Sequence, residues 1–129
     1  MSNMDDFNEA TVLILAKLYE AFPQRLWFKV ADLVEAAADD NKLRNYGDTI
    51  LFLESEGFIR YESRTLNEVF NGITLTSKGL TVLNYVPDVL KEKTPLGTKL
   101  LSVVQEGSKE GIRTVVEQVI KSAISFPSS

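Results

Sequence analysis

Apolar residues recur at three- and four-residue spacing in the first part of the chain. Between residues 7 and 22 they stand at Phe7, Ala10, Ile14, Leu18, Ala21 and Phe22. This spacing predicts a helix with a buried face, and additional apolar residues widen that face enough for neighbours on two sides. Asp5 or Asp6 is expected to cap the N-terminus of this helix, and Pro23 is expected to end it.

A short aromatic run at residues 26–28 favours a strand over a helix. The residues that follow, 30–38, place Val30, Leu33, Val34 and Ala37 on one face, which predicts a second helix. After an Asp-Asp-Asn turn, a third helix is expected from about residue 42 to residue 56.

A glycine and a threonine mark the two ends of a hairpin predicted after this third helix. Gly57 suits a left-handed helix C-cap, and Thr76 suits the N-cap of a following helix. Strand-like segments are expected at residues 58–62 and 72–76, with residues 63–70 as the loop between them. Asn71-Gly72 is expected to supply a turn or a bulge where the chain returns.

Two segments resemble bacterial winged-helix regulators of the MarR and PadR kind. LESEGFIR (residues 53–60) is similar to their junction between recognition helix and wing. ITLTSKGLTVL (residues 73–83) resembles the return of the wing through Leu-Thr-x-x-Gly. The resemblance covers roughly residues 26–86. It implies an α+β, mostly helical fold: a three-helix winged helix-turn-helix core with a small antiparallel wing, and an appended C-terminal amphipathic helical segment.

The resemblance also assigns the two sides of the recognition helix, and here the sequence departs from the family. It places Tyr46, Ile50 and Leu53 in the core, with Leu43 at the entry. Asp48, Leu51 and Phe52 then fall on or near the side that DNA-binding members press into the major groove. Those members place basic or hydroxyl residues there, so an acid, a leucine and a phenylalanine indicate a protein partner instead.

The charge of this region leads to the same interpretation. Five basic and five acidic residues stand between Lys42 and Lys78, so the region has no net positive charge to attract phosphates. A nucleic-acid partner stays open as the alternative, and its contacts would come from Lys42, Arg44, Asn45, Arg60, Arg64 and Lys78.

The C-terminal part is again helical in pattern. Thr94-Pro95 is a good helix start, and residues 96–124 carry an apolar stripe formed by Leu100, Val104, Gly107, Gly111, Val115 and Val119. One continuous helix is expected, with its two glycines allowing another helix to approach. Because such a stripe is too long for a small domain to bury, it predicts self-association as a homodimer. The alternative is two shorter helices with a bend at the glycines.

The expected organisation is a winged-helix domain (1–90), a connector (91–94), a C-terminal helical segment (95–125) and a disordered tail (126–129).

The amino-acid composition excludes several kinds of catalytic and metal site. Hydrophobic residues make up 44% and charged residues 25%, which is typical of a globular protein. The chain has no cysteine and no histidine, and its net charge is −4. Thiol and imidazole catalysis and ordinary zinc sites are therefore excluded, and neither a cofactor nor a metal is expected.

No apolar run approaches the length of a membrane span, and the N-terminus is acidic, unlike a secretion signal, so a cytoplasmic protein without a membrane partner is expected. The absence of a phosphate loop, a nucleophile elbow or a carboxylate pair indicates that the protein is not an enzyme. The sequence thus predicts a non-catalytic winged-helix interaction module that self-associates through its C-terminal helix. The alternative is a DNA-binding transcriptional regulator of the winged-helix class.

Overall fold

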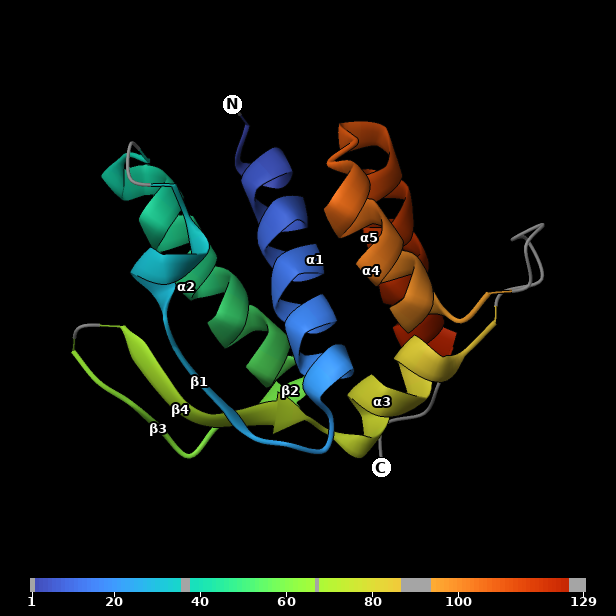
Figure 1. Cartoon of the computed structure of the whole chain (residues 1–129), viewed down its shortest axis with the longest axis horizontal. Coiled ribbons are helices and arrows are strands. Elements are labelled where there is room, and N and C mark those ends of the chain that lie inside the picture. The colour runs from blue at the N-terminus through green and yellow to red at the C-terminus, as the bar shows by residue number, and fades with distance from the viewer. Residues whose placement is uncertain (1, 36–37, 67, 87–93, 126–129) are drawn as a thin grey trace.

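The computed structural model describes residues 2–35, 38–66, 68–86 and 94–125 (Figure 1). Its elements are α1 (Asn3–Ala21), β1 (Leu26–Lys29), the 3₁₀ helix η1 (Val30–Leu33), α2 (Asp40–Ser55), β2 (Ile59–Arg60), β3 (Ser63–Arg64), β4 (Val69–Leu75), α3 (Ser77–Asn84), α4 (Leu96–Glu106) and α5 (Lys109–Ser125). The described chain is therefore α+β and mostly helical, with a small antiparallel sheet, as predicted.

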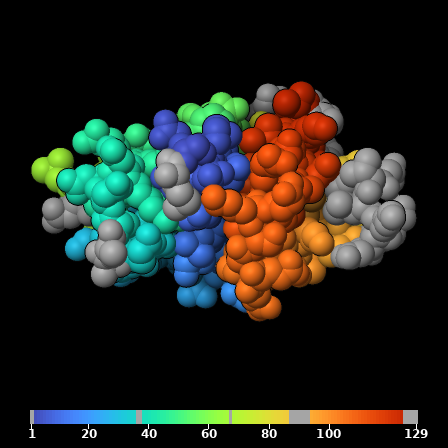
Figure 2. All heavy atoms as spheres, turned by 90° about the horizontal axis from the view of Figure 1, so that it is seen from above, coloured from blue at the N-terminus to red at the C-terminus, as the bar shows by residue number. Residues whose placement is uncertain are grey.

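Helix α1 lies at the centre of the helical layer. Helix α2 packs on one side of it, and α4 and α5 pack on the other (Figures 1 and 2). Ile14 and Leu18 are fully buried, in agreement with the wide apolar stripe. The expected N-cap is wrong, because the Ser2 hydroxyl accepts a hydrogen bond from the Asp5 backbone N–H at 3.1 Å. Asp5 and Asp6 lie in the first turn, where carboxylates suit the helix dipole.

The strands form a sheet in the order β1-β4-β2, and β3 also pairs with β4. The expected pairing of residues 58–62 with 72–76 is confirmed, since Ile59 lies opposite Leu75 and Arg60 opposite Thr74. The short aromatic strand joins this hairpin through β4, which was also expected.

The hairpin itself is longer than the sequence predicts. Residues 63–70 are not all loop, because β3 pairs with the start of β4, with Ser63 opposite Asn71. The bulge expected at Asn71-Gly72 is confirmed. Leu26 lies opposite Ile73 while Trp27 lies opposite Asn71, so Gly72, with φ of 67°, is the extra residue on β4.

The junction between α2 and α3 depends on Gly57, Thr76 and Gly79. Gly57 has φ of 84° just beyond the end of α2, which confirms the predicted left-handed position. The Thr76 hydroxyl accepts a hydrogen bond from the Gly79 backbone N–H at 3.0 Å and donates to the carbonyl oxygen of Gly57. A Cβ atom on Gly79 would collide with the carbonyl oxygen of Phe58, so α3 approaches β2 as closely as it does because residue 79 is glycine.

The helix predicted over residues 30–38 is wrong. Among the described residues of this segment, only Val30–Leu33 is helical, as a 3₁₀ turn, and Val34 is extended with φ of −116° and ψ of 159°. The Val30 backbone N–H donates to the carbonyl oxygen of Glu68 at 3.0 Å, so contact with the hairpin continues past the end of β1. The β-branched side chains of Val30 and Val34 also favour extended backbone.

The single helix predicted over residues 96–124 is also wrong, because the segment folds back as α4 and α5. Gly107 ends α4 in the left-handed conformation, with φ of 69°. Leu100, Val115 and Val119 are buried, and α4 and α5 both pack on α1. The alternative of two helices with a bend at a glycine is therefore the correct one.

Both C-terminal helices belong to the same hydrophobic core as α1 and the sheet. Pro95 stands at the N-cap of α4 and Leu96 is its first residue, one position later than the sequence predicts. The connector expected at residues 91–94 lies outside the described residues except for Thr94, and the tail expected at residues 126–129 lies wholly outside them.

Candidate interaction surfaces

Helix α2 has a buried side and an exposed side. The buried side comprises Tyr46, Ile50 and Leu53, with Leu43 half-buried at the start, as expected. Of the residues predicted to bind a partner, Asp48 and Phe52 are exposed, whereas Leu51 is half-buried and packs against the core. The structure therefore leaves Asp48 and Phe52 accessible and only part of Leu51.

The Phe52 ring lies against Phe7 of α1. Their ring centroids are 5.6 Å apart and the ring planes meet at 77°, the edge-to-face geometry that aromatic pairs prefer. Phe52 nevertheless keeps 41% of its surface exposed. Met4, which is 61% exposed, precedes Phe7 by three residues and therefore lies on the same side of α1. Met4 and Phe52 are exposed and Phe7 is half-buried, and we call these three residues the α1–α2 apolar patch.

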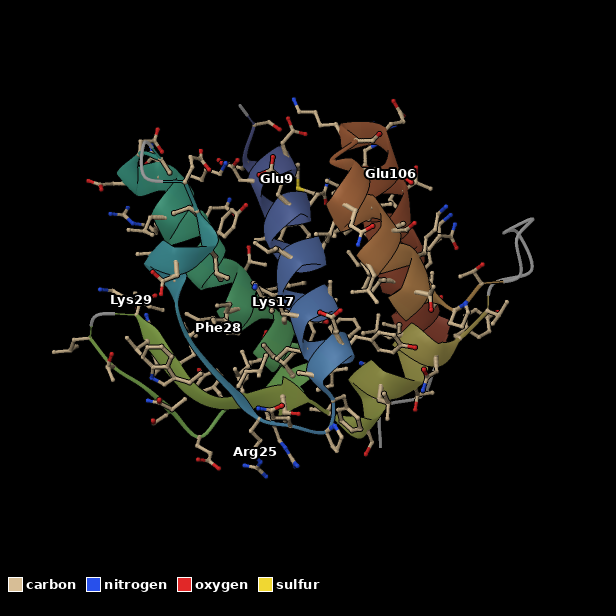
Figure 3. All side chains as sticks on the ribbon, viewed as in Figure 1. Glu9, Lys17, Arg25, Phe28, Lys29 and Glu106 are labelled. Carbon is tan, nitrogen blue, oxygen red and sulfur yellow. The ribbon has the colours of Figure 1, made fainter. Side chains whose placement is uncertain are left out.

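Lys42 does not point freely into solvent. Its Nζ lies 3.4 Å from Glu9 Oε1 and 3.2 Å from Glu35 Oε1, and its side chain is only 12% exposed. The ammonium also lies 5.9 Å from the centroid of the Tyr46 ring. Glu9 is on the upper half of α1 in Figure 3, so the ion pairs connect α1, α2 and the segment after η1. Lys42 is thus a structural cation.

The contacts around Lys42 shift the pKa values of Tyr46, Lys42 and Glu35. Burial, followed by the nearby Glu9 carboxylate, raises the pKa of Tyr46, whose hydroxyl donates to Glu9 Oε1 at 3.1 Å. Desolvation opposes a charge on Lys42, but the hydrogen bond to Glu35 and the Glu9 charge outweigh it and raise the pKa of Lys42. A backbone hydrogen bond and then the Lys42 hydrogen bond lower the pKa of Glu35.

Three further residues predicted to contact nucleic acid are also engaged within the chain. Asn45 Nδ2 donates to the carbonyl oxygen of Asn3 at 3.3 Å. Arg64 binds Glu68 through two nitrogens, at 3.0 and 2.6 Å. Lys78 Nζ donates to a backbone carbonyl oxygen at the end of α2, at 3.1 Å. A nucleic-acid contact by any of them would compete with an intramolecular one.

Arg44 and Arg60 are the members of that predicted set whose side chains form no ion pair or hydrogen bond with any described residue. Both are exposed, but Arg44 is in the first half of α2 and Arg60 is beyond its C-terminal end. Arg60 lines an open, mostly polar depression of about 560 Å³, together with Lys78 and residues at the end of α2 and the start of α3. The structure therefore does not bring the six predicted residues together.

The predicted self-association residues are divided by the bend between α4 and α5. Leu100, Val115 and Val119 are buried inside the chain, whereas Val104 is 38% exposed. Gly107 and Gly111 lie at the bend and in the first turn of α5. Most of the apolar stripe is therefore covered by its own chain, and the reason for expecting a dimer through it is removed.

The outward face of the sheet was not predicted from the sequence. On that face Trp27 is 62% exposed while its neighbour Phe28 is buried. Arg25 and Lys29, which precede and follow Trp27 by two positions, are exposed as well. Side chains alternate between the two faces of a strand, so Arg25, Trp27 and Lys29 could have been expected on one face. The aromatic run by itself did not show whether that face or the other one is exposed to solvent.

No group of three histidine, cysteine, aspartate or glutamate side chains in the described residues is arranged to hold a metal ion. Within the same part of the chain, no helix combines the length and apolar character needed to cross a membrane. Comparison with protein-family models, with curated proteins and with solved structures finds no match to this chain.

Proposed function

We propose that the chain is a non-catalytic interaction module with a winged-helix core, in which α2 takes the place of the recognition helix. The order α1-β1-η1-α2-β2-β4 and the strand order β1-β4-β2 support this interpretation. The close packing of α3 against the end of α2 and β2, through Thr76 and Gly79, also supports it. In this interpretation the 3₁₀ turn η1 stands where the second helix of a helix-turn-helix would be.

The observation that carries the proposal is the α1–α2 apolar patch, with the carboxylate of Asp48 one turn before Phe52 on the same helix. Exposed aromatic and methionine side chains are enriched at protein–protein interfaces. An acidic residue on this helix would repel the phosphates of a DNA groove. The patch is therefore suited to an apolar surface of another protein.

The alternative of a duplex-binding regulator receives less support from the charges. Lys42, Arg64 and Lys78 each make intramolecular contacts. Among the predicted contact residues, only Arg44 and Arg60 therefore offer cations without an ion pair to a described residue, and they lie in the first half of α2 and beyond its C-terminal end. Neutralising few phosphates releases few counterions, and the resulting affinity for duplex DNA is weak.

Site-specific photocrosslinking tests the proposal. A benzophenone amino acid at Asp48, in the full chain and in cells that express it, should give an adduct with a discrete protein. The Phe52→Ala variant should abolish this adduct, because truncation removes the ring at the centre of the patch. Ile124→Ala is the matched control, since Ile124 is 80% exposed on α5, and it should leave the adduct unchanged.

A mobility-shift assay on random duplex DNA tests the DNA-binding alternative. We expect no measurable shift at physiological salt, and at most a weak one at low salt. Submicromolar binding at physiological salt that is lost in the Arg44→Ala, Arg60→Ala double variant, together with an adduct indifferent to Phe52, would replace the proposal with the DNA-binding alternative.

A further inference from the structure

The sheet has one face that no described helix covers. Helices α1 and α2 stand on one side of it, and the other side is open in Figure 1. Phe28 and Phe70 lie opposite each other across β1 and β4, and both are buried towards the helices. Because neighbouring side chains along a strand point to opposite faces, Trp27 and Lys29 lie on the open face. Arg25, just before β1, points away from the helices in Figure 3.

Trp27 is on β1, an edge strand of this open face. It lies opposite Asn71 of β4, and Asn71 lies opposite Ser63 of β3. Asn71 Nδ2 donates to Ser63 Oγ at 3.2 Å, so the two polar side chains beside the indole bond to each other. Gly72, the bulge residue, has no side chain, and the Glu62 side chain lies over it. An exposed indole therefore stands beside a polar surface.

The charges of the open face differ in sign from those of the whole chain. The Lys29 side chain has no ion pair or hydrogen bond to a described residue. The same is true of the Arg60 side chain on β2, which is exposed at the end of the sheet that also lines the depression at the α2–α3 junction. Arg25 pairs with Glu62, whose side chain lies over Gly72 within the face, so this carboxylate is neutralised by Arg25. The face thus has three cations and one carboxylate, although the chain carries a net charge of −4. Charges farther away than about 8–10 Å are screened at physiological salt, so this local excess decides what the face attracts.

We propose that the open sheet face, formed by Arg25, Trp27, Lys29 and Arg60 around Asn71, binds single-stranded nucleic acid. Trp27 stacks on a base, while Lys29 and Arg60 contact the phosphates on either side. Every base has a flat face that an exposed aromatic ring can stack on, so this binding is tolerant of sequence. In a duplex those base faces are hidden, which restricts the site to unpaired strands. The surface lies across the sheet from the helices and is separate from the α1–α2 apolar patch, so it does not depend on the proposed function.

Trp27 is the only tryptophan in the chain, which makes intrinsic fluorescence a direct report on this residue. The experiment titrates the full-length protein at low salt with a short oligothymidylate, following tryptophan quenching and the anisotropy of a labelled strand. We expect saturable quenching that coincides with the anisotropy change, at a dissociation constant of tens of micromolar or tighter. Raising the salt should weaken binding, because phosphate contacts release counterions.

Four variants locate the site. Trp27→Ala should weaken binding by about tenfold or more, and Trp27→Phe should restore most of the loss because a phenyl ring still stacks. Lys29→Ala and Arg60→Ala should each lower the slope of log affinity against log salt by about 0.7. Lys17→Ala is the matched control, since Lys17 is an exposed lysine on α1 without an ion pair to a described residue, and it should change neither quantity.

Two competitors define the contrary results. A duplex of the same sequence and an acidic oligoglutamate peptide should each bind more weakly than the single strand and should not quench Trp27 by stacking. Equal binding of oligoglutamate would show a general anion or acidic-protein surface and overturn the proposal. Absence of any binding at low salt, or binding that the Trp27→Ala variant retains in full, would overturn it as well.

Discussion

At the scale of single residues, glycines in this chain act for two different physical reasons. Gly79 sits where α3 approaches the backbone of Phe58, and the space there admits no Cβ. Gly107 has no atom near the position of a Cβ, but its φ of 69° strains any residue with a side chain. One glycine is needed for space and the other for backbone conformation.

Alanine at these two positions should separate the two reasons. We expect Gly79→Ala to lower the free energy of unfolding by about 3 kcal/mol, since the collision is with backbone that cannot move aside cheaply. Gly107→Ala should cost only about 1 kcal/mol, the strain of a left-handed residue with no clash. Urea unfolding of both variants measures this, and equal losses would contradict the assignment.

The raised pKa of Tyr46 predicts that the free energy of unfolding depends on pH. Its pKa is raised in the folded chain above the ordinary value of 10.0, so the folded state keeps the phenol proton that the unfolded chain releases. Stability from this group is complete below about pH 10 and is lost as the pH rises above it, because the unfolded state then binds fewer protons. Unfolding free energies from pH 8 to pH 11 should therefore fall more steeply for the wild type than for Tyr46→Phe. Parallel curves would exclude the effect.

At the scale of elements, the C-terminal hairpin of α4 and α5 completes the core on one side of α1. Leu100 is fully buried between helices, whereas Val104, one turn later on α4, is 38% exposed. The two positions belong to the same apolar stripe in the sequence. Only the fold assigns one to the core and the other to the surface.

Leu100→Ala and Val104→Ala form a matched pair for this assignment. Leu100→Ala should lower the free energy of unfolding by about 2–5 kcal/mol, because it leaves a cavity in the core. Val104→Ala should change it by less than about 0.5 kcal/mol. Denaturant unfolding at two protein concentrations is the measurement. Losses that depend on concentration, or that are similar for both variants, would indicate an interface between chains instead.

At the scale of the whole molecule, the two surfaces proposed as binding sites are separate. The α1–α2 apolar patch lies on the helical layer, and the open sheet face lies across the sheet from that layer. The proposed protein partner and the proposed single strand would thus occupy different sides. Because they do not overlap, each variant described above should affect one kind of binding and leave the other unchanged.

The sequence predicted self-association because the apolar stripe of the C-terminal segment was expected to be exposed, and in the structure most of that stripe is buried. With Leu100, Val115 and Val119 inside the chain, we expect a monomer in light scattering at tens of micromolar. A dimer would require another surface, and the apolar patch at Phe52 is the first to test. A dimer that Phe52→Ala dissociates would identify a second copy of the chain as the patch's partner.

The sequence by itself determined the elements whose signals are local. The stripe of α1, the buried side of α2, the left-handed Gly57, the Thr76 cap and the bulge at Gly72 all follow from residues within a turn or two of one another. A helix face or a cap is decided by such near neighbours, so the pattern was sufficient.

Tertiary structure alone decided the features that depend on distant partners. Residues 30–38 have a helical pattern, yet the bond from Val30 to Glu68 keeps the segment's first residue tied to the hairpin. The stripe in residues 96–124 fits one helix or two, and contact with α1 favours the bend that buries it. Nothing in the sequence near Lys42 shows that it is paired, because its partners Glu9 and Glu35 are brought beside it only by the fold. Trp27 and Phe28 are both large aromatic residues, and the packing of helices on one face of the sheet buries Phe28 and leaves the indole exposed.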